Sequence, residues 1–445
     1  MFQTIINAFK QKDLRNKILL TLGILLIYRI GCWIPVPGIE VDAFTSITTD
    51  GAGNPVGGAS FLTLLSSITG GALSNGAILA LGVIPYISAS IIMQLLTIAI
   101  PSLERMSKSG DEGRKKISKI TRYAALALSI AQAVAIVIAF SSSGAINVDA
   151  LGAGIPSWMV SAVVGIVLIA GGMFTLWLGE KITDLGIGNG VSLLIFVGIL
   201  ASAGKAILGG IETAIADIDK LWPLILFLGA VIIIFGLIVF IDLAERKIPV
   251  QYAKQIKGRK MYGGQSTFIP IKVNSSGVLP LIFATALVAF PQLIMSIFWP
   301  TSSAYNWYAS NMGTGSWPFF AVTAILIFFF TYFYAQISFN PEDVSRSLQQ
   351  NGGFVPGIRA GKPTSEYLKR ISNRITFFGA FYLSVIFILP TVAFMILGNT
   401  TGAASDGLVN AFSVTGLLIV VSVALEFDKQ LNAQLLMKNY RGFLK

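Results

Sequence analysis

The sequence predicts an all-α polytopic membrane protein with ten transmembrane helices. Of its 445 residues, 54% are hydrophobic and only 12% are charged, whereas about a quarter of the residues in a soluble domain are charged. Twenty-nine of the 32 Lys and Arg residues lie at the two termini or in alternate gaps between ten apolar segments. This alternation is typical of the positive-inside bias, so both termini and the long basic loops are expected on the cytoplasmic side.

The first element is an amphipathic segment, Met1–Lys17. It combines the apolar residues Phe2, Ile5, Ile6 and Phe9 with the basic residues Lys10, Lys12, Arg15 and Lys17. A secretory signal peptide is the competing interpretation. No small-residue cleavage site follows the first apolar run, which is followed instead by Trp33 and Pro35. The pattern therefore favours an interfacial helix that leads into an uncleaved first span.

The spans follow from the length of each apolar run, because a helix needs about 20 mostly apolar residues to cross a bilayer. Their edges are uncertain by several residues, and their even number agrees with two termini on one side. They are predicted near 18–36, 77–100, 121–140, 158–178, 187–204, 221–241, 276–298, 318–338, 375–397 and 408–427.

The segment Phe61–Asn75 is apolar but too short to cross, and Gly70 and Gly71 interrupt it. Such a segment lies at membrane depth only where protein shields it or where it lines an aqueous cavity. Composition alone slightly favours the alternative, an amphipathic helix on the outer surface.

A four-residue motif, Gly82-Val83-Ile84-Pro85, is nearly repeated as Gly277-Val278-Leu279-Pro280. The two copies are equivalent if the chain divides into two sets of five spans, 18–204 and 221–427. An odd number of spans per half makes the halves inverted and pseudo-symmetric, and broken helices at matching places indicate a central pathway. A repeat this short also arises by chance.

Several motifs together resemble the SecY / Sec alpha-subunit family of protein-conducting channels. They are Arg29-Ile-Gly with Pro35-Val-Pro-Gly-Ile39, Gly70-Gly-Ala-Leu-Ser74, Gly82 to Ser90, Gly186-Ile-Gly-Asn-Gly-Val-Ser192, Gln265-Ser-Thr267 with Lys272-Val-Asn274, and Phe354-Val-Pro-Gly-Ile-Arg359. Their order and spacing are specific, and the match runs nearly end to end. One departure is Ala360, where bacterial members commonly have proline.

The resemblance implies two five-helix halves around a central hourglass pore that opens sideways to lipid. It also implies that Phe61–Asn75 is a plug on the outer side, in place of a surface helix. The plug residues carried over are Phe61, Leu64, Leu65, Ile68, Gly70, Gly71 and Leu73.

A channel for unfolded chains needs a neck that closes around any side chain, and a flexible aliphatic ring excludes water without binding ions. The members of this ring are assigned by the resemblance alone, because most Val and Ile residues of a membrane protein face lipid or core. They are Val83, Ile87, Val191, Ile195, Ile282 and Ile419.

The loops 242–274 and 339–374 carry thirteen basic residues and also contain apolar and turn-forming groups. Orientation and contact with anionic lipids account for part of this charge. The resemblance adds docking of the ribosome and of the motor ATPase SecA. The docking residues carried over are Arg246, Lys247, Lys254, Lys257, Arg259, Lys260 and Arg359.

Three polar residues, Ser88, Gln94 and Asn274, lie in or next to spans two and seven. For Gln94 and Asn274, interhelical hydrogen bonding and polar contact at the lateral gate are equally supported. The glycines from Gly186 to Gly190 follow an apolar helix, which excludes a nucleotide-binding loop. Asn189 is expected to cap the next helix.

The sequence thus predicts a non-enzymatic channel subunit of the bacterial plasma membrane without cofactors. It would pass secretory proteins and release hydrophobic segments sideways, with SecE, SecG, SecA and the ribosome as partners. The tail 428–445 is expected in the cytoplasm. A secondary transporter is the alternative, although Arg29 is the one ionisable group well inside a span. An intramembrane protease is disfavoured because the chain has no histidine and no mid-span aspartate pair.

Overall fold

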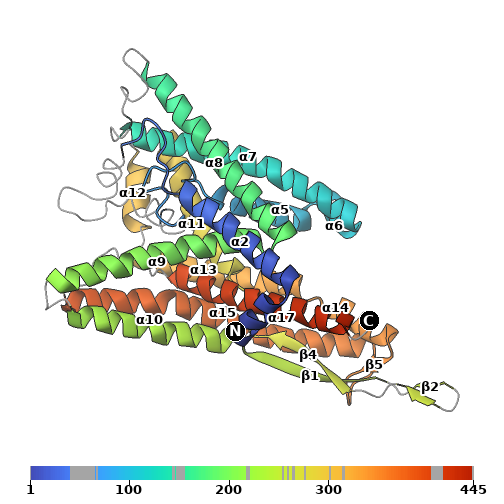
Figure 1. Cartoon of the computed structure of the whole chain (residues 1–445). Helices are drawn as coiled ribbons and strands as arrows, with labels where there is room; N and C mark the ends of the chain where they lie inside the picture. Colours follow the sequence, from blue (N-terminus) through green and yellow to red (C-terminus); the bar gives the residue numbers. More distant parts are fainter. Residues whose placement is uncertain are drawn as a thin grey trace. The chain divides into compact units, whose positions relative to one another are not determined.

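The computed structural model describes most of the chain as helices. The residues it describes are 2–40, 66, 69–142, 146, 156–216, 221–252, 255–257, 260–262, 266–274, 277–299, 302–312, 316–401 and 414–442. The helices before residue 220 are α1 (Phe2–Lys10), α2 (Lys12–Gly31), α5 (Ile84–Ala99), α6 (Pro101–Lys108), α7 (Asp111–Ser142), α8 (Ser157–Leu185) and α9 (Gly190–Ala216) (Figure 1).

The later helices alternate with short strands. They are α10 (Leu221–Asp242), α11 (Leu279–Phe298), α12 (Ser303–Asn311), α13 (Trp317–Ser338), α14 (Pro341–Gln350), α15 (Lys362–Thr401) and α17 (Val414–Gly442). The strands are β1 (Glu245–Tyr252), β2 (Gln255–Lys257), β3 (Lys260–Tyr262), β4 (Ser266–Lys272) and β5 (Gly353–Phe354).

A helix overlaps each of the ten predicted spans. Within the described ranges, α7, α8, α9, α10, α13 and α15 are long and apolar enough to cross a membrane. A seventh span results if α5 and α6, which bend by 106° at Pro101, count as one. Three more predicted spans overlap α2, α11 and α17. None of these three helices meets both requirements, and α2 begins with the charged residues Lys12, Asp13 and Arg15.

The second predicted span begins later than expected, because residues 78–83 form turns and α5 starts only at Ile84. Gly82 has a positive φ of 54°, and Pro85 lies in the first turn of α5. Proline is tolerated there because its missing N–H needs no partner. The motif from Gly82 to Pro85 therefore marks a helix start, as an interrupted span requires.

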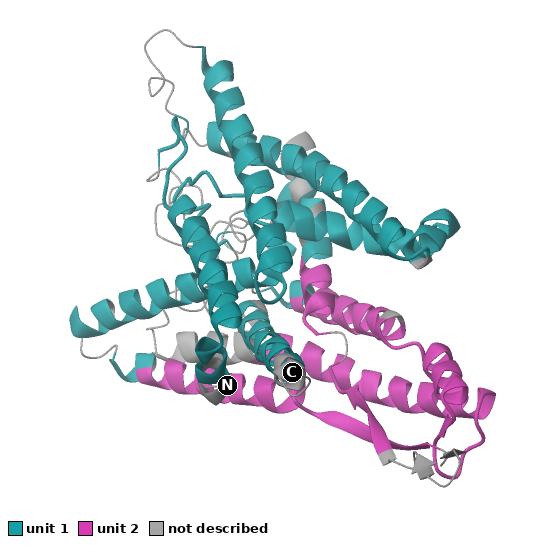
Figure 2. Ribbon diagram, turned by 45° about the vertical axis from the view of Figure 1, so that its right-hand side comes forward, with its two compact units in different colours: residues 1–224, 286–319, 400–445 teal, residues 225–285, 320–399 magenta. Residues whose placement is uncertain are grey.

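The chain divides into two compact units (Figure 2). Unit 1 comprises Met1–Leu224, Ala286–Phe319 and Thr400–Lys445, and unit 2 comprises Ile225–Thr285 and Phe320–Asn399. In unit 1, a buried cluster around Leu73, Leu81 and Leu168 joins the turn segment to α7 and α8. A second cluster, which includes Ala8, Leu14, Ile187 and Leu431, packs α1 and α2 against α17 and the turn before α9.

Unit 2 contains a three-stranded antiparallel sheet with the order β4-β1-β5. Ile248 and Val250 of β1 alternate with exposed residues and are almost fully buried. They pack with Leu348 of α14, Val355 and Leu368 of α15. The sheet therefore has one buried face, and α14 and the start of α15 cover it.

Candidate functional site

The predicted plug segment is described only at its C-terminal end. Phe61, Leu64, Leu65 and Ile68 lie outside the described residues, whereas Gly70, Gly71 and Leu73 lie inside them. Residues 69–76 form consecutive turns, and Leu73 is completely buried in the core of unit 1. The described end of the segment is thus packed into unit 1.

Arg29 fixes this end of the segment. Its Nη1 atom donates a hydrogen bond of 2.7 Å to the carbonyl oxygen of Gly70, which is 41 residues away. The guanidinium also lies 5.6 Å from the ring centroid of Trp33. Gly70 has a positive φ of 73°, and a Cβ there would come within 2.9 Å of the backbone of Gly198 on α9. Only glycine allows this approach without displacing α9 or Arg29.

Five of the six predicted pore-ring residues belong to unit 1. Val83 is the residue before α5, and the N–H of Ile87 donates to its carbonyl at 3.0 Å, so the two side chains lie one helical turn apart. Val191 and Ile195 have the same spacing on α9, which packs against α17, the helix that carries Ile419. Val83, Ile195 and Ile419 are buried, and Ile87 and Val191 are half-buried.

The start of α9 is fixed by its own side chains. Asn189 Oδ1 accepts hydrogen bonds from the N–H groups of Val191 at 3.1 Å and Ser192 at 3.4 Å. The predicted cap is therefore confirmed. On α8, Gly179 leaves room for Val191, because a Cβ at position 179 would lie 3.2 Å from Val191 Cγ2. The sixth predicted ring residue, Ile282, is half-buried on α11 in unit 2.

The three predicted gate residues differ in their surroundings. Ser88 is half-buried on α5, and the exposed Gln94 donates a hydrogen bond of 3.4 Å to Ser90. Asn274 is buried, and its Nδ2 donates to Asp242 Oδ1 at the end of α10 at 2.6 Å. This hydrogen bond of Asn274 therefore connects the segment before α11 with the C-terminal end of α10.

The two long basic loops fold together. Strand β1 pairs with β4 from Glu245↔Lys272 to Gln251↔Ser266, and with β5 at Gln251↔Phe354 and Tyr252↔Gly353. The pairing of β1 with β5 joins loop 242–274 to loop 339–374. We name the assembly of β1, β4, β5 and α14 the loop sheet.

The predicted docking residues on the loop sheet are exposed. Lys247 Nζ lies 3.5 Å from Glu245 Oε1 and 4.9 Å from the ring centroid of Phe268. Arg246 forms no ion pair with a described residue. Lys257 and Lys260 face each other as the last pair of the short ladder β2–β3, and Lys254 and Arg259 lie outside the described residues.

Arg359 lies on a turn that the fold holds firmly. Its carbonyl accepts a hydrogen bond of 2.7 Å from Thr364 Oγ1, and the carbonyl of Gly361 accepts one of 2.7 Å from Ser345. The backbone is thus fixed on both sides of Ala360 without the proline common at that position. The guanidinium is exposed and pairs with no described residue, so it is available to a partner.

Sequence reasoning missed two polar contacts. Besides the bond from Arg29 to Gly70, Arg122 of α7 forms an ion pair of 2.6 Å with Glu180 of α8. Each contact joins residues far apart in the sequence, so no spacing signal could have revealed it. Among the residues that the structure describes, no group of three or more His, Cys, Asp or Glu side chains could hold a metal.

Comparison with known proteins gives consistent results. The SecY family model matches residues 77–427. The protein translocase subunit SecY of Streptomyces coelicolor is 42% identical over 451 residues, which cover 100% of both chains. That of Mycobacterium tuberculosis is 40% identical over 460 residues, again covering 100% of both chains.

The fold is also similar to solved structures. One is described as the structure of a protein conducting channel, with a TM-score of 0.62 and 21% identity, and the match covers 94% of this chain and 91% of the other. Another is Sec61 in the canine ribosome-channel complex from the endoplasmic reticulum, with a TM-score of 0.56, 20% identity and the same coverage. These identities are low, so the two structures support the fold.

Proposed function

The chain belongs to the SecY family, and we propose that it passes unfolded secretory proteins across the membrane and releases hydrophobic segments sideways into the bilayer. It is a channel subunit of a translocase, in a family without enzymatic activity. The observation that carries this conclusion is the identity of 42% over the full length of a translocase subunit. Nothing in the family match favours a secondary transporter.

For the architecture, we propose ten transmembrane helices in two inverted halves of five around a central pore. Support comes from the helix that overlaps each predicted span and from the breaks before α5 and α11, where Gly82 and Gly277 both have positive φ angles. The pore ring would comprise Val83, Ile87, Val191, Ile195, Ile282 and Ile419. Five of these lie on or next to α5, α9 and α17 in one unit.

For the partners, we propose that the loop sheet and Arg359 dock the ribosome and SecA in the cytoplasm. The guanidinium of Arg359 is exposed and pairs with no described residue. This supports the role, because its planar fork recognises carboxylate, phosphate or backbone acceptors. The canine relative, which is described as part of a ribosome-channel complex, agrees with a ribosome as partner. The small subunits SecE and SecG, anionic lipids and a bacterial plasma membrane with cytoplasmic termini complete the proposal.

Reconstitution tests the function directly. The chain is placed in liposomes with the small subunits, and SecA, ATP and a secretory precursor are added outside. A channel gives precursor that external protease cannot digest, and only with ATP. A precursor with a hydrophobic stop segment should remain in the lipid after alkaline extraction.

Liposomes that contain the small subunits without the chain are the control. Protease protection equal to that control, with the chain shown to be inserted, would contradict the proposal.

A further inference from the structure

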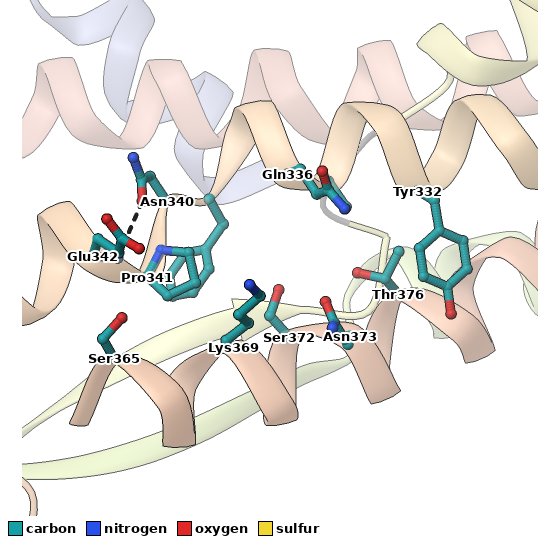
Figure 3. Close-up of a pocket in the computed structure, with 12 residues that line it drawn as sticks. Tyr332, Gln336, Asn340, Pro341, Glu342, Ser365, Lys369, Ser372, Asn373 and Thr376 are labelled. Atoms are coloured by element: carbon teal, nitrogen blue, oxygen red, sulfur yellow. Dashed lines mark hydrogen bonds between the residues drawn. The ribbon is translucent and has the colours of Figure 1, made fainter. Parts of the chain in front are cut away.

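A polar cavity of about 200 Å³ lies in unit 2, where α13 ends and α14 begins, against the N-terminal part of α15 (Figure 3). One water molecule occupies roughly 30 Å³ in the liquid, so the cavity admits a group of several heavy atoms. It does not include any residue of the predicted pore ring or any predicted docking residue.

Polar side chains on α15 point into this cavity and form no hydrogen bond with a described residue. Ser372 is 9% exposed and Thr376 is 5% exposed, and both line the cavity. Figure 3 shows them on the same side of α15 as Lys369 and Asn373. None of the four has a hydrogen bond or ion pair with a described residue. The hydroxyl groups of Ser372 and Thr376 are thus open to the cavity and able to form hydrogen bonds with a polar ligand there.

The cavity lining carries one charge of each sign. Lys369 lies on α15, and Glu342 lies in the first turn of α14. No described residue forms an ion pair with either of them. Their formal charges sum to zero, so an anion without a cation would satisfy Lys369 and leave Glu342 facing a like charge. A zwitterion with a phosphate and an ammonium group satisfies both.

The depth of the cavity indicates a lipid, given that the chain spans the membrane as the proposed channel does. The apolar helix α13 ends at Ser338, and α15 changes from a basic sequence before Arg374 to an apolar one after it. Both changes occur at the cavity and are typical of the headgroup region. Directly beside it, Phe328 lies between Tyr332 and the half-exposed Phe377, with ring centroids 5.4 Å and 5.7 Å apart.

We propose that this cavity binds the headgroup of a zwitterionic glycerophospholipid that carries a phosphodiester and a primary ammonium, as phosphatidylethanolamine does. Lys369, with the hydroxyl groups of Ser372 and Thr376, binds the phosphate, and Glu342 binds the ammonium. The acyl chains extend over Phe328 and Phe377. The inference rests on the proposed function only for the depth of the site in the membrane.

Native mass spectrometry of the full chain in mild detergent tests the proposal, with phosphatidylethanolamine and phosphatidylglycerol of equal acyl composition added separately. The chain should retain phosphatidylethanolamine about tenfold better, which is the scale of one charge-assisted hydrogen bond. Lys369→Gln should weaken retention of both lipids by about tenfold. Glu342→Gln should remove the preference while phosphatidylglycerol is still retained.

Arg370→Gln is the matched control, because Arg370 is the exposed neighbour of Lys369 and does not line the cavity. It should behave as the unaltered chain does. Soluble phosphoethanolamine at the same concentration should not bind, because it has no acyl chains. Equal retention of the two lipids, an unchanged Lys369→Gln chain, or tight binding of soluble phosphoethanolamine would each overturn the proposal. The assay measures lipid retention alone, so its failure and a failure of translocation are separate results.

Discussion

At the scale of single residues, two arginines have opposite roles. The guanidinium of Arg29 is used inside the protein, where it binds the carbonyl of Gly70 at 2.7 Å. That of Arg359 is exposed, and only its backbone is held by the fold, through Thr364. We therefore expect substitution of Arg29 to change the packing of the Gly70 turn, and substitution of Arg359 to change the binding of a partner.

Replacing Arg359 with glutamate should block translocation of precursor into vesicles while the chain stays inserted. An exposed loop charge changes the free energy of unfolding by no more than about 0.5 kcal/mol, so the loss would reflect docking. Arg105→Glu reverses an equally exposed charge on α6 and serves as the control. Undiminished transport by the Arg359→Glu chain would remove this residue from the docking surface.

Replacing Arg29 with glutamine should raise the resting ion leak of the channel. A hydrogen bond to a charged donor contributes roughly 1.5–3 kcal/mol, and its loss frees the described end of the predicted plug segment. Single-channel recording in planar bilayers measures the leak, and Arg29→Lys, which keeps a charged donor, should restore part of the seal. If the resting ion leak of both variants equals that of the original chain, Arg29 does not hold the predicted plug segment in place.

At the scale of elements, the loop sheet turns two loops into one folded surface. Its strand pairing depends on Gly353, because a Cβ there would lie 3.0 Å from the ring of Tyr252 and 3.3 Å from Leu348. Gly353 pairs with Tyr252 in the ladder of β1 with β5. Both Tyr252 and Leu348 belong to the core beneath the sheet.

Replacing Gly353 with valine should therefore separate β5 from β1 and destabilise the sheet by roughly 1–3 kcal/mol, the range of overpacking. Hydrogen exchange at Gln251 and Tyr252 should accelerate, and protease should cut the loop 339–374 more readily. Thr267→Val, at an exposed position on β4, should change neither. Exchange rates that stay the same in the Gly353→Val chain would show that the pairing tolerates a side chain there.

The sequence predicted the helices well and the contacts between distant segments poorly. Hydrophobic run length predicted a position for each of ten spans, and a helix overlaps each position, because burying about 20 apolar residues in lipid is a local requirement. The Asn189 cap was also local, since donor and acceptor are two or three residues apart. The bond from Arg29 to Gly70 and the pairing of Tyr252 with Gly353 depend on the folded path of the chain, which no local pattern encodes.

At the scale of the whole molecule, the central question is whether the six aliphatic residues form a neck. A narrow apolar constriction excludes a continuous column of water. The same side chains in a lipid-facing position would have no effect on conductance. The two locations therefore predict opposite results when amides replace the aliphatic groups.

Replacing Ile87 and Ile195 together with asparagine should let ions pass through the idle channel and should make weakly hydrophobic signal sequences acceptable. Conductance in planar bilayers and precursor transport measure these effects. The control replaces Ile92 and Leu200, exposed residues on the same two helices, with asparagine. Amides exposed to hydrocarbon should impair insertion without raising conductance. A poorly inserted but ion-tight Ile87→Asn/Ile195→Asn chain would place these residues outside the pore.

The pairing of β1 with β5 also determines when the loop sheet can form during synthesis of the chain. Tyr252 cannot form its pair until Gly353 has been synthesised. At about 5–20 residues per second, the two residues are made roughly 5–20 seconds apart. During that interval α11, α12, α13 and α14 are synthesised, and of its two partner strands β1 can pair only with β4. An unfinished copy therefore lacks the complete loop sheet until β5 has been made. If the loop sheet docks ribosomes and motors as we propose, such a copy does not compete with finished channels for them.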